Sequence, residues 1–195
     1  KNISAEGLVA KGGANGENKL SIITRAEKFR VGNFIDLLNF SIHQTAASDT
    51  LITNMFWNNW ELITYSGALY TTTGFSLDSD NKRRTKVRMH PSSIIIADST
   101  WHISQSEANF YPEGMSIKDF RIEQNGEFVS LNGFLHKEAD DGLLLVFNRM
   151  QTDHFLRGND MGKISFGGNI DGTLRLSDYY RDPLLTADVA IRDFV

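Results

Sequence analysis

The sequence predicts an all-β protein, built from a curved, meandering antiparallel sheet that forms a β-taco or an open β-solenoid with an apolar inner face. Three observations lead to this prediction. Apolar and polar residues alternate over long runs, turn-forming dipeptides separate the runs, and helical periodicity is sparse. A β-sandwich is the alternative arrangement of the same strands. In either case residues 1–195 are expected to form one continuous β unit.

The clearest alternation covers Ile164–Leu176, where apolar residues or glycines occupy every second position. Successive side chains of a strand point to opposite faces, so this run predicts one apolar and one polar face in a firmly specified register. Glycines within the run indicate a bulge, a bend or a hairpin tip. A second alternating run covers Leu185–Ile191.

The other strands follow from shorter runs and from turn signals. Asn125-Gly126 favours the positive φ angles of a type I′ turn and predicts a hairpin between Phe120–Ile122 and Phe128–Leu135. Asp141-Gly142 marks the next turn, before a strand at Leu143–Phe147. Earlier strands are expected at Lys19–Thr24, Leu38–Ile42, Leu51–Trp57, Thr64–Thr73, Thr85–Met89 and Ile94–Ile103.

One or two short helices are also expected. Met150–Leu156 is the best candidate, because Met150, Phe155 and Leu156 can share a helical face. Phe34–Leu38 is the second candidate. Within a curved sheet, a helix such as the first could fill the groove.

Composition excludes several classes of protein. The chain of 195 residues has a net charge of −4, which argues against a nucleic-acid partner. It contains no cysteine, so disulfides, thiol nucleophiles and thiolate metal sites are excluded. No run reaches the roughly 20 apolar residues of a transmembrane helix. The chain starts at Lys1 without a signal pattern and stops inside an alternating run, which predicts a segment of a longer secreted protein.

No constellation of residues predicts catalysis, a metal or another cofactor. The histidines His43, His90, His102, His136 and His154 lack a metal-binding spacing. The sequence lacks a G-x-S-x-G elbow, and its acidic pairs lie at turns, where solvated carboxylates are expected. Asp78, Asp80 and Asn81 resemble the opening of a calcium loop, but a solvated turn is the favoured interpretation. We therefore expect a protein that is not an enzyme.

Two segments of the chain have a composition that suggests a function. The basic run Asn81–Arg88 could meet lipid headgroups or an acidic partner, although a solvated loop that enters an edge strand is favoured. An aromatic-rich middle could stack on sugars, although a place in the core or groove is favoured. Its members are Trp57, Trp60, Tyr65, Tyr70, Trp101, Phe110 and Tyr111.

Part of the chain resembles a known family. The segments FWNNWELITYSGALYTTTGF, MHPSSIIIADSTWHI, SIKDFRIEQNGEFVSLNGFLHKEADDGLLLVF and KISFGGNIDGTLRLSDYYRDPLLTADVAIRDF are similar to the TamB (translocation and assembly module) proteins of Bacteroides-type bacteria, within the AsmA-like superfamily. The resemblance covers about two thirds of the chain. The order strand, Asn-Gly turn, strand, ADDGLLL and GNIDGTLRL is its most distinctive part.

The resemblance implies a periplasmic location and a role in envelope biogenesis. Members of the family are anchored in the inner membrane and cross the periplasm as a β-taco with a hydrophobic groove. They are implicated in phospholipid transport to the outer membrane, and in outer-membrane protein assembly with an Omp85-family partner. By this resemblance, phospholipid acyl chains are the expected ligand of the present chain. The groove lining would include Ile164, Phe166, Ile170, Leu174, Leu176, Leu185, Val189, Ile191, Phe128 and Leu131.

This chain departs from the family by lacking the anchor helix, so membrane attachment and docking of the Omp85-family partner are not expected of it. Two other functions stay open. The first is a structural or protein-binding module whose edge strand pairs with a strand of an outer-membrane protein client. The second is a glycan-binding β domain that uses the region of Trp57 and Trp60.

Overall fold

A computed structural model describes residues 3–15, 19–31, 35–59, 64–137, 141–151 and 168–193 of the chain. The described residues form strands joined by turns and contain no helix. The strands are β1 (Ile3–Glu6), β2 (Val9–Asn15), β3 (Lys19–Val31), β4 (Ile35–Ala47), β5 (Thr50–Asn59), β6 (Tyr65–Leu77), β7 (Arg83–Met89), β8 (Ser92–Ile96), β9 (Ser99–Ile103), β10 (Ser106–Tyr111), β11 (Gly114–Gln124), β12 (Glu127–His136), β13 (Gly142–Gln151), β14 (Asn169–Ser177) and β15 (Leu184–Arg192).

All these strands belong to one antiparallel sheet of 15 strands, with the main order β1-β3-β4-β5-β6-β7-β10-β11-β12-β13-β14-β15. The remaining three strands extend their neighbours along the strand direction. β1 and β2 pair with opposite ends of β3, β7 and β8 with opposite ends of β6, and β9 and β10 with opposite ends of β11. The sheet is therefore an up-and-down meander, in which some long strands are interrupted. The predicted all-β class and meandering antiparallel sheet are confirmed.

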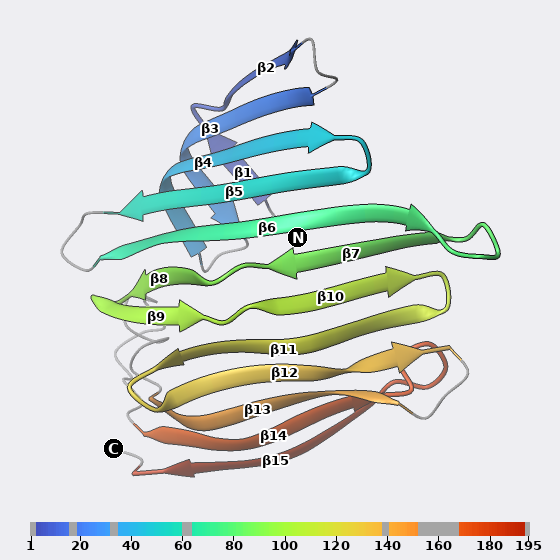
Figure 1. The fold of residues 1–195 in the computed structure, drawn as a ribbon. Helices are drawn as coiled ribbons and strands as arrows, with labels where there is room; N and C mark the ends of the chain where they lie inside the picture. Colours follow the sequence, from blue (N-terminus) through green and yellow to red (C-terminus); the bar gives the residue numbers. More distant parts are fainter. Residues whose placement is uncertain are drawn as a thin grey trace.

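The sheet is curved rather than flat. Figure 1 shows the strands stacked from β2 at the top to β15 at the bottom, with β1 and the adjoining parts of β3 and β4 turned behind β5 and β6. At this bend Asn39 has a φ of 49°, and the ladder between β3 and β4 passes from Ala26↔Phe40 to Lys28↔Leu38 without a pair between them. The rings of Phe29 and Phe40 stack here at a centroid distance of 4.7 Å.

Two β-bulges add to the curvature at the other end of the sheet. The register shifts between Ile117 and Phe120 in β11, and between Phe147 and Met150 in β13. A bulge leaves a backbone N–H without its ladder partner, and neighbouring side chains accept these protons. Asp119 N donates to Asn132 Oδ1 at 2.6 Å, and Arg149 N donates to Asp171 Oδ1 at 2.9 Å.

The hairpin predicted at Asn125-Gly126 is present between β11 and β12, with φ angles of 48° and 85° at these two residues. The strand predicted at Ile94–Ile103 is instead a hairpin. Ala97 and Asp98 have φ angles of 49° and 64° and connect β8 to β9. This turn was hidden in the sequence because it lacks the usual Asn-Gly or Asp-Gly signal.

The helix expected over Phe34–Leu38 is wrong for its described residues, because β4 begins at Ile35 and pairs with β3 and β5 on its two sides. Met150 and Gln151, at the start of the other expected helix, belong to β13. The rest of that helix, residues 152–156, lies outside the described residues.

Candidate functional site

The candidate groove residues lie on three strands near one end of the sheet. Leu131 lies on β12, Ile170, Leu174 and Leu176 on β14, and Leu185, Val189 and Ile191 on β15. Residues that face each other directly across two antiparallel strands point to the same side of the sheet. Direct pairs connect Phe120 to Leu131, Leu131 to Leu145, Leu145 to Leu174 and Leu174 to Ala187. These apolar side chains therefore share one face.

A second row of direct pairs crosses the whole sheet on this same face, which we call the apolar face. It begins at Leu185 on β15, ends at Ala14 on β2, and is apolar or small at almost every strand. Its members are Leu185, Leu176, Leu143, Gly133, Ile117, Ala108, Val87, Thr73, Leu51, Ala46, Leu20 and Ala14. The apolar face is therefore continuous from one edge strand to the other.

The apolar face is covered only locally. Trp101 is fully buried, and Ile103, Leu135, Met150 and Phe40 are 7%, 4%, 2% and 5% exposed. By contrast, Leu185 on the edge strand β15 is 65% exposed, and Leu20 on β3, one strand in from the other edge, is 45% exposed. Most other positions of the apolar face, including Leu131, Leu174 and Leu176, are half-buried. All the described strands belong to one curved sheet, and the half-buried positions keep part of their apolar surface accessible.

One described candidate residue, Phe128, has another position. Phe128 lies on the opposite face, where it pairs directly with Glu123 and Asn148. The guanidinium of Arg121 lies 3.7 Å from the centre of its ring. Phe128 and Leu131 are three residues apart in one strand, and a regular strand cannot turn both toward one face. Ile164 and Phe166 lie outside the described residues.

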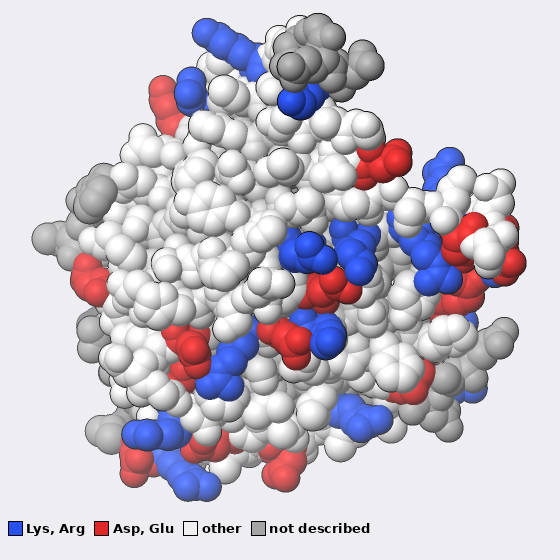
Figure 2. All heavy atoms as spheres, viewed as in Figure 1, with Lys and Arg blue, Asp and Glu red and all other residues white. Residues whose placement is uncertain are grey.

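The opposite face, which we call the polar face, carries most of the formal charges of the described strands. Glu127 is an exception, because it lies on the apolar face and is only 8% exposed. Figure 2 shows Lys, Arg, Asp and Glu side chains gathered over β7, β10 and β11, while the area over β4, β5 and β6 is mostly uncharged. Glu107 on β10 lies 3.1 Å from Lys86 Nζ and 3.7 Å from Arg88 Nη2, both on β7. A hydrogen bond from Asn109 and the ammonium of Lys86 lower the pKa of Glu107. The carboxylate of Glu107 thus offsets part of the positive charge of Lys86 and Arg88 across the two strands.

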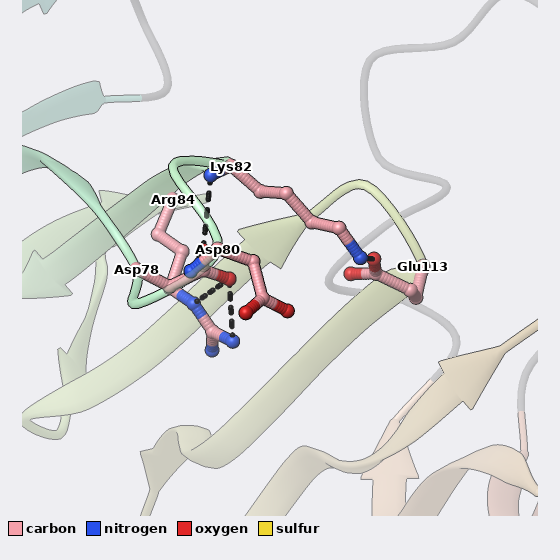
Figure 3. Close-up of polar contacts among 5 residues, drawn as sticks. All are labelled: Asp78, Asp80, Lys82, Arg84 and Glu113. Carbon is pink, nitrogen blue, oxygen red and sulfur yellow. Dashed lines mark hydrogen bonds and ion pairs between the residues drawn. The ribbon is translucent and has the colours of Figure 1, made fainter.

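The basic run is therefore part of the sheet. The expectation that it enters an edge strand is wrong, because β7 lies between β6 and β10. In the turn before it, Asp78 Oδ1 accepts hydrogen bonds from the backbone N of Asp80 and of Lys82, at 3.0 and 2.9 Å. Asp78 Oδ2 accepts from Arg84, and Lys82 reaches Glu113 (Figure 3). The hydrogen bonds that Asp78 accepts lower its pKa, with the bond from Lys82 N as the main cause.

His43, His90 and His102 each contact a different neighbour within the sheet. His90 Nε2 lies 2.8 Å from Thr72 Oγ1, and His102 Nδ1 lies 3.3 Å from Ser93 Oγ. His43 packs edge-on against Phe56 at 5.6 Å. No three His, Asp or Glu residues of the described ranges come together as a metal-binding group. His154 lies outside these ranges.

The structure also brings together a group of residues that sequence reasoning missed. A hollow of about 570 Å³ opens on the polar face and is lined by residues such as Phe56, Asn58, Ser66, Ser93 and Thr100. Five strands contribute to it, β4, β5, β6, β8 and β9, so it depends on their relative register. Its only signal in the sequence is the set of small residues that alternate in β6 and β8, which is too common to be specific.

The aromatic residues of the middle of the chain divide between the two faces. Trp101 belongs to the apolar face, and the indole of Trp57 lies against Gly67 on that same face. Phe56 and Tyr70 lie on the polar face and pack edge-on at 5.8 Å. Trp60 lies outside the described residues. The core position favoured by the sequence applies to Trp101.

Comparisons with known proteins leave the family of this chain open. Within the described residues, no helix is both long enough and apolar enough to cross a membrane. The chain matches no family model, no curated protein and no solved structure.

Proposed function

We propose that this chain is a section of a lipid-carrying β structure, and that phospholipid acyl chains lie along its apolar face. The continuous row of apolar and small side chains from Leu185 to Ala14 is the observation that carries the proposal. An acyl chain needs a dry surface without directional partners, and each buried methylene contributes about 0.8 kcal/mol. Fixed polar groups are therefore not required for binding.

The dimensions of the sheet support this proposal. The main path through the sheet has twelve strands, and a spacing of about 4.8 Å between strands gives a span of roughly 50 Å. The hydrocarbon core of a bilayer is about 30 Å thick and contains two leaflets. One acyl chain therefore needs only part of the length that the apolar face offers.

The resemblance to TamB-like proteins extends the proposal to the cell envelope. In that case the chain lies in the periplasm as part of a longer protein anchored in the inner membrane. It then contributes a hydrophobic groove along which phospholipid moves between the two membranes, or supports outer-membrane protein assembly. An Omp85-family partner would bind other parts of the full-length protein. No comparison identifies this family, so this extension rests on the sequence resemblance alone.

Photo-crosslinking from neighbouring positions of one strand tests the lipid proposal. A benzophenone side chain at Leu174 lies on the apolar face, and the same probe at Thr173 lies on the polar face of the same strand. With phospholipid present, we expect adducts at Leu174 and far fewer at Thr173, detected by intact-protein mass spectrometry. Equal yields at the two positions, or none at Leu174, would reject the proposal.

Strand pairing with a protein client is a second candidate function. The exposure of β15 at the edge of the sheet favours it. All nine residues of β15 are exposed, and β14 is its only partner in the described sheet. An edge strand presents unpaired backbone groups that can accept another strand. Deuterium uptake over Leu184–Arg192 tests this function. Slower exchange after addition of an unfolded outer-membrane protein supports it, and unchanged exchange contradicts it.

A further inference from the structure

The hollow on the polar face lies at one end of β5, β6, β8 and β9, on the other side of the sheet from the proposed lipid surface. A row of direct pairs crosses it, from Phe56 to Ala68, Ser93 and His102. In this row the two central strands contribute small side chains, and the two outer strands contribute rings. A second row, from Asn58 to Ser66, Ile95 and Thr100, adds the larger side chain of Ile95 to the lining. The hollow is therefore a trough with a low floor and aromatic walls, formed by the register of these four strands.

A second, smaller hollow continues the trough along the sheet. Its volume is about 320 Å³, and it shares Ala68 and Ser93 with the first hollow, whose volume is about 570 Å³. Tyr70 and His102 join its lining. Both volumes fall in or near the range of about 300–1,000 Å³ that is typical of small-molecule sites. The trough therefore has room for a ligand larger than a single ring.

The rings of the trough are held in place by their neighbours. Phe56 packs edge-on against His43 on one side and against Tyr70 on the other, at 5.6 and 5.8 Å. Ser93 Oγ contacts His102 Nδ1 at 3.3 Å. A ring fixed in this way loses little side-chain entropy when a flat ligand packs against it. Phe56 is thus a ready platform for an apolar ring face.

The polar groups of the trough are neutral and numerous. Ser66, Ser93 and Thr100 provide hydroxyls that can donate or accept, and Asn58 provides an amide. Asn58 Oδ1 is buried without a hydrogen-bond partner among the groups around it, and the terminal torsion of an asparagine is soft enough to turn this oxygen toward the hollow. No Lys, Arg, Asp or Glu lines either hollow within the described residues.

From this arrangement we infer that the trough binds a neutral carbohydrate, with one sugar ring against Phe56 and its hydroxyls bonded to Asn58, Ser66, Ser93 or Thr100. A pyranose has a face of C–H groups and a rim of hydroxyls, which matches one aromatic wall and several neutral hydrogen-bonding groups. Phosphate and carboxylate ligands need cationic partners that the trough does not provide. A bare acyl chain would leave the hydroxyls and the amide of the trough without partners, at a cost in free energy.

Titration with neutral tetrasaccharides tests this inference. Cellotetraose, maltotetraose, laminaritetraose and chitotetraose are added to the chain, and binding is followed by saturation-transfer NMR and by calorimetry. We expect at least one of them to bind the unmodified chain. Ala68→Leu raises the floor of the trough between Phe56 and His102, and should weaken that binding by about tenfold or more, equivalent to ~1.4 kcal/mol.

Thr45→Leu is the matched control, because Thr45 lies on the polar face and lines neither hollow. It should leave sugar binding unchanged, and circular dichroism should show both variants folded. If none of the four sugars binds, or if binding persists in Ala68→Leu, the inference is overturned. The photo-crosslink at Leu174 is measured on the same variant and should not change, so failure of the sugar site is distinguishable from failure of the lipid proposal.

Discussion

The indole of Trp57 covers Gly67 across the β5–β6 pair, in the space that a side chain at position 67 would occupy. A Cβ at Gly67 would lie 2.5 Å from Cη2 of Trp57 and 2.8 Å from Cγ2 of Ile94. The two residues pair directly, and Gly67 also pairs with Ile94 on β8. The absence of a side chain at Gly67 therefore lets a large ring lie flat where β5, β6 and β8 meet on the apolar face.

Gly67→Ala should destabilise the chain, because the new methyl group displaces the Trp57 ring from a packed position. We expect a loss of about 1–3 kcal/mol in the free energy of unfolding, measured by urea denaturation. Gly74→Ala is the control on the same strand, since nothing lies within 4 Å of its Cβ position. That variant should be neutral, or stabilised by about 0.5–1 kcal/mol. Equal effects of the two substitutions would contradict the proposed contact.

Trp101→Ala should have the larger effect of a core truncation. Trp101 is 0% exposed on the apolar face, whereas Phe134 on the polar face is 47% exposed. The first substitution leaves a cavity and should cost about 3–5 kcal/mol. Phe134→Ala should cost about 1 kcal/mol or less, as is usual for exposed positions. The midpoint of urea denaturation separates the two, and a similar shift in both would mean that the two faces are assigned wrongly.

Stability should fall as the pH is lowered, partly through Asp36. Hydrogen bonds from Arg30 and Lys28 hold the pKa of Asp36 well below its ordinary value, at N to O distances of 2.7 and 2.8 Å. A carboxylate with a lowered folded-state pKa stabilises the fold above its unfolded pKa of about 3.9, and this contribution is lost as the pH falls toward the folded value.

Asp36→Asn should therefore reduce the free energy of unfolding at neutral pH more than at pH ~2. The side chain is 38% exposed, and solvent screening keeps the loss at neutral pH below about 1 kcal/mol. Denaturation curves recorded between pH ~2 and ~7 measure the difference. Asp49→Asn, in the exposed turn between β4 and β5, controls for the change in net charge. An identical pH profile in wild type and Asp36→Asn would contradict this assignment.

A charge on the apolar face should prevent lipid binding. Leu131→Asp places a carboxylate between Phe120 and Leu145, where an acyl chain would have to desolvate it. We expect the amount of copurified phospholipid to fall by about tenfold or more, equivalent to ~1.4 kcal/mol. Asn132→Asp puts the same charge on the polar face one residue away and should retain the lipid. Mass spectrometry of extracted lipid gives the readout, alongside thermal unfolding of both variants.

The strands of this sheet were largely predictable because alternation is a local property. β14 and β15 follow the runs Ile170–Leu176 and Leu185–Ile191, and the Asn125-Gly126 turn forms where its φ preference predicts. The run that begins β4 predicts a helix instead of a strand because Phe34, Leu37 and Leu38 fit the i, i+3, i+4 spacing of a helical face. Pairing with β3 and β5 decides its conformation, and that pairing is not visible in the segment itself.

Relations between distant strands could not be predicted in the same way. β7 was expected at an edge, but the β8–β9 hairpin folds back and brings β10 beside it. The trough requires Phe56, Ala68, Ser93 and His102 to lie in one row, and a shift of a single residue in any strand would remove it. The apolar face followed from local alternation, whereas the trough follows only from the full set of registers.

Most strands pair with the strand that comes before or after them in the chain. The other pairings, β1 with β3, β6 with β8, β7 with β10 and β9 with β11, join strands with at most two strands between them in sequence. Such a sheet is nearly one-dimensional, with stability that is a sum of nearest-neighbour terms. Assembly can then proceed during synthesis, as each hairpin emerges and zips onto the growing edge without waiting for distant sequence. Under tension the same order runs backwards, and the sheet should peel strand by strand from its outermost hairpin rather than rupture as a block.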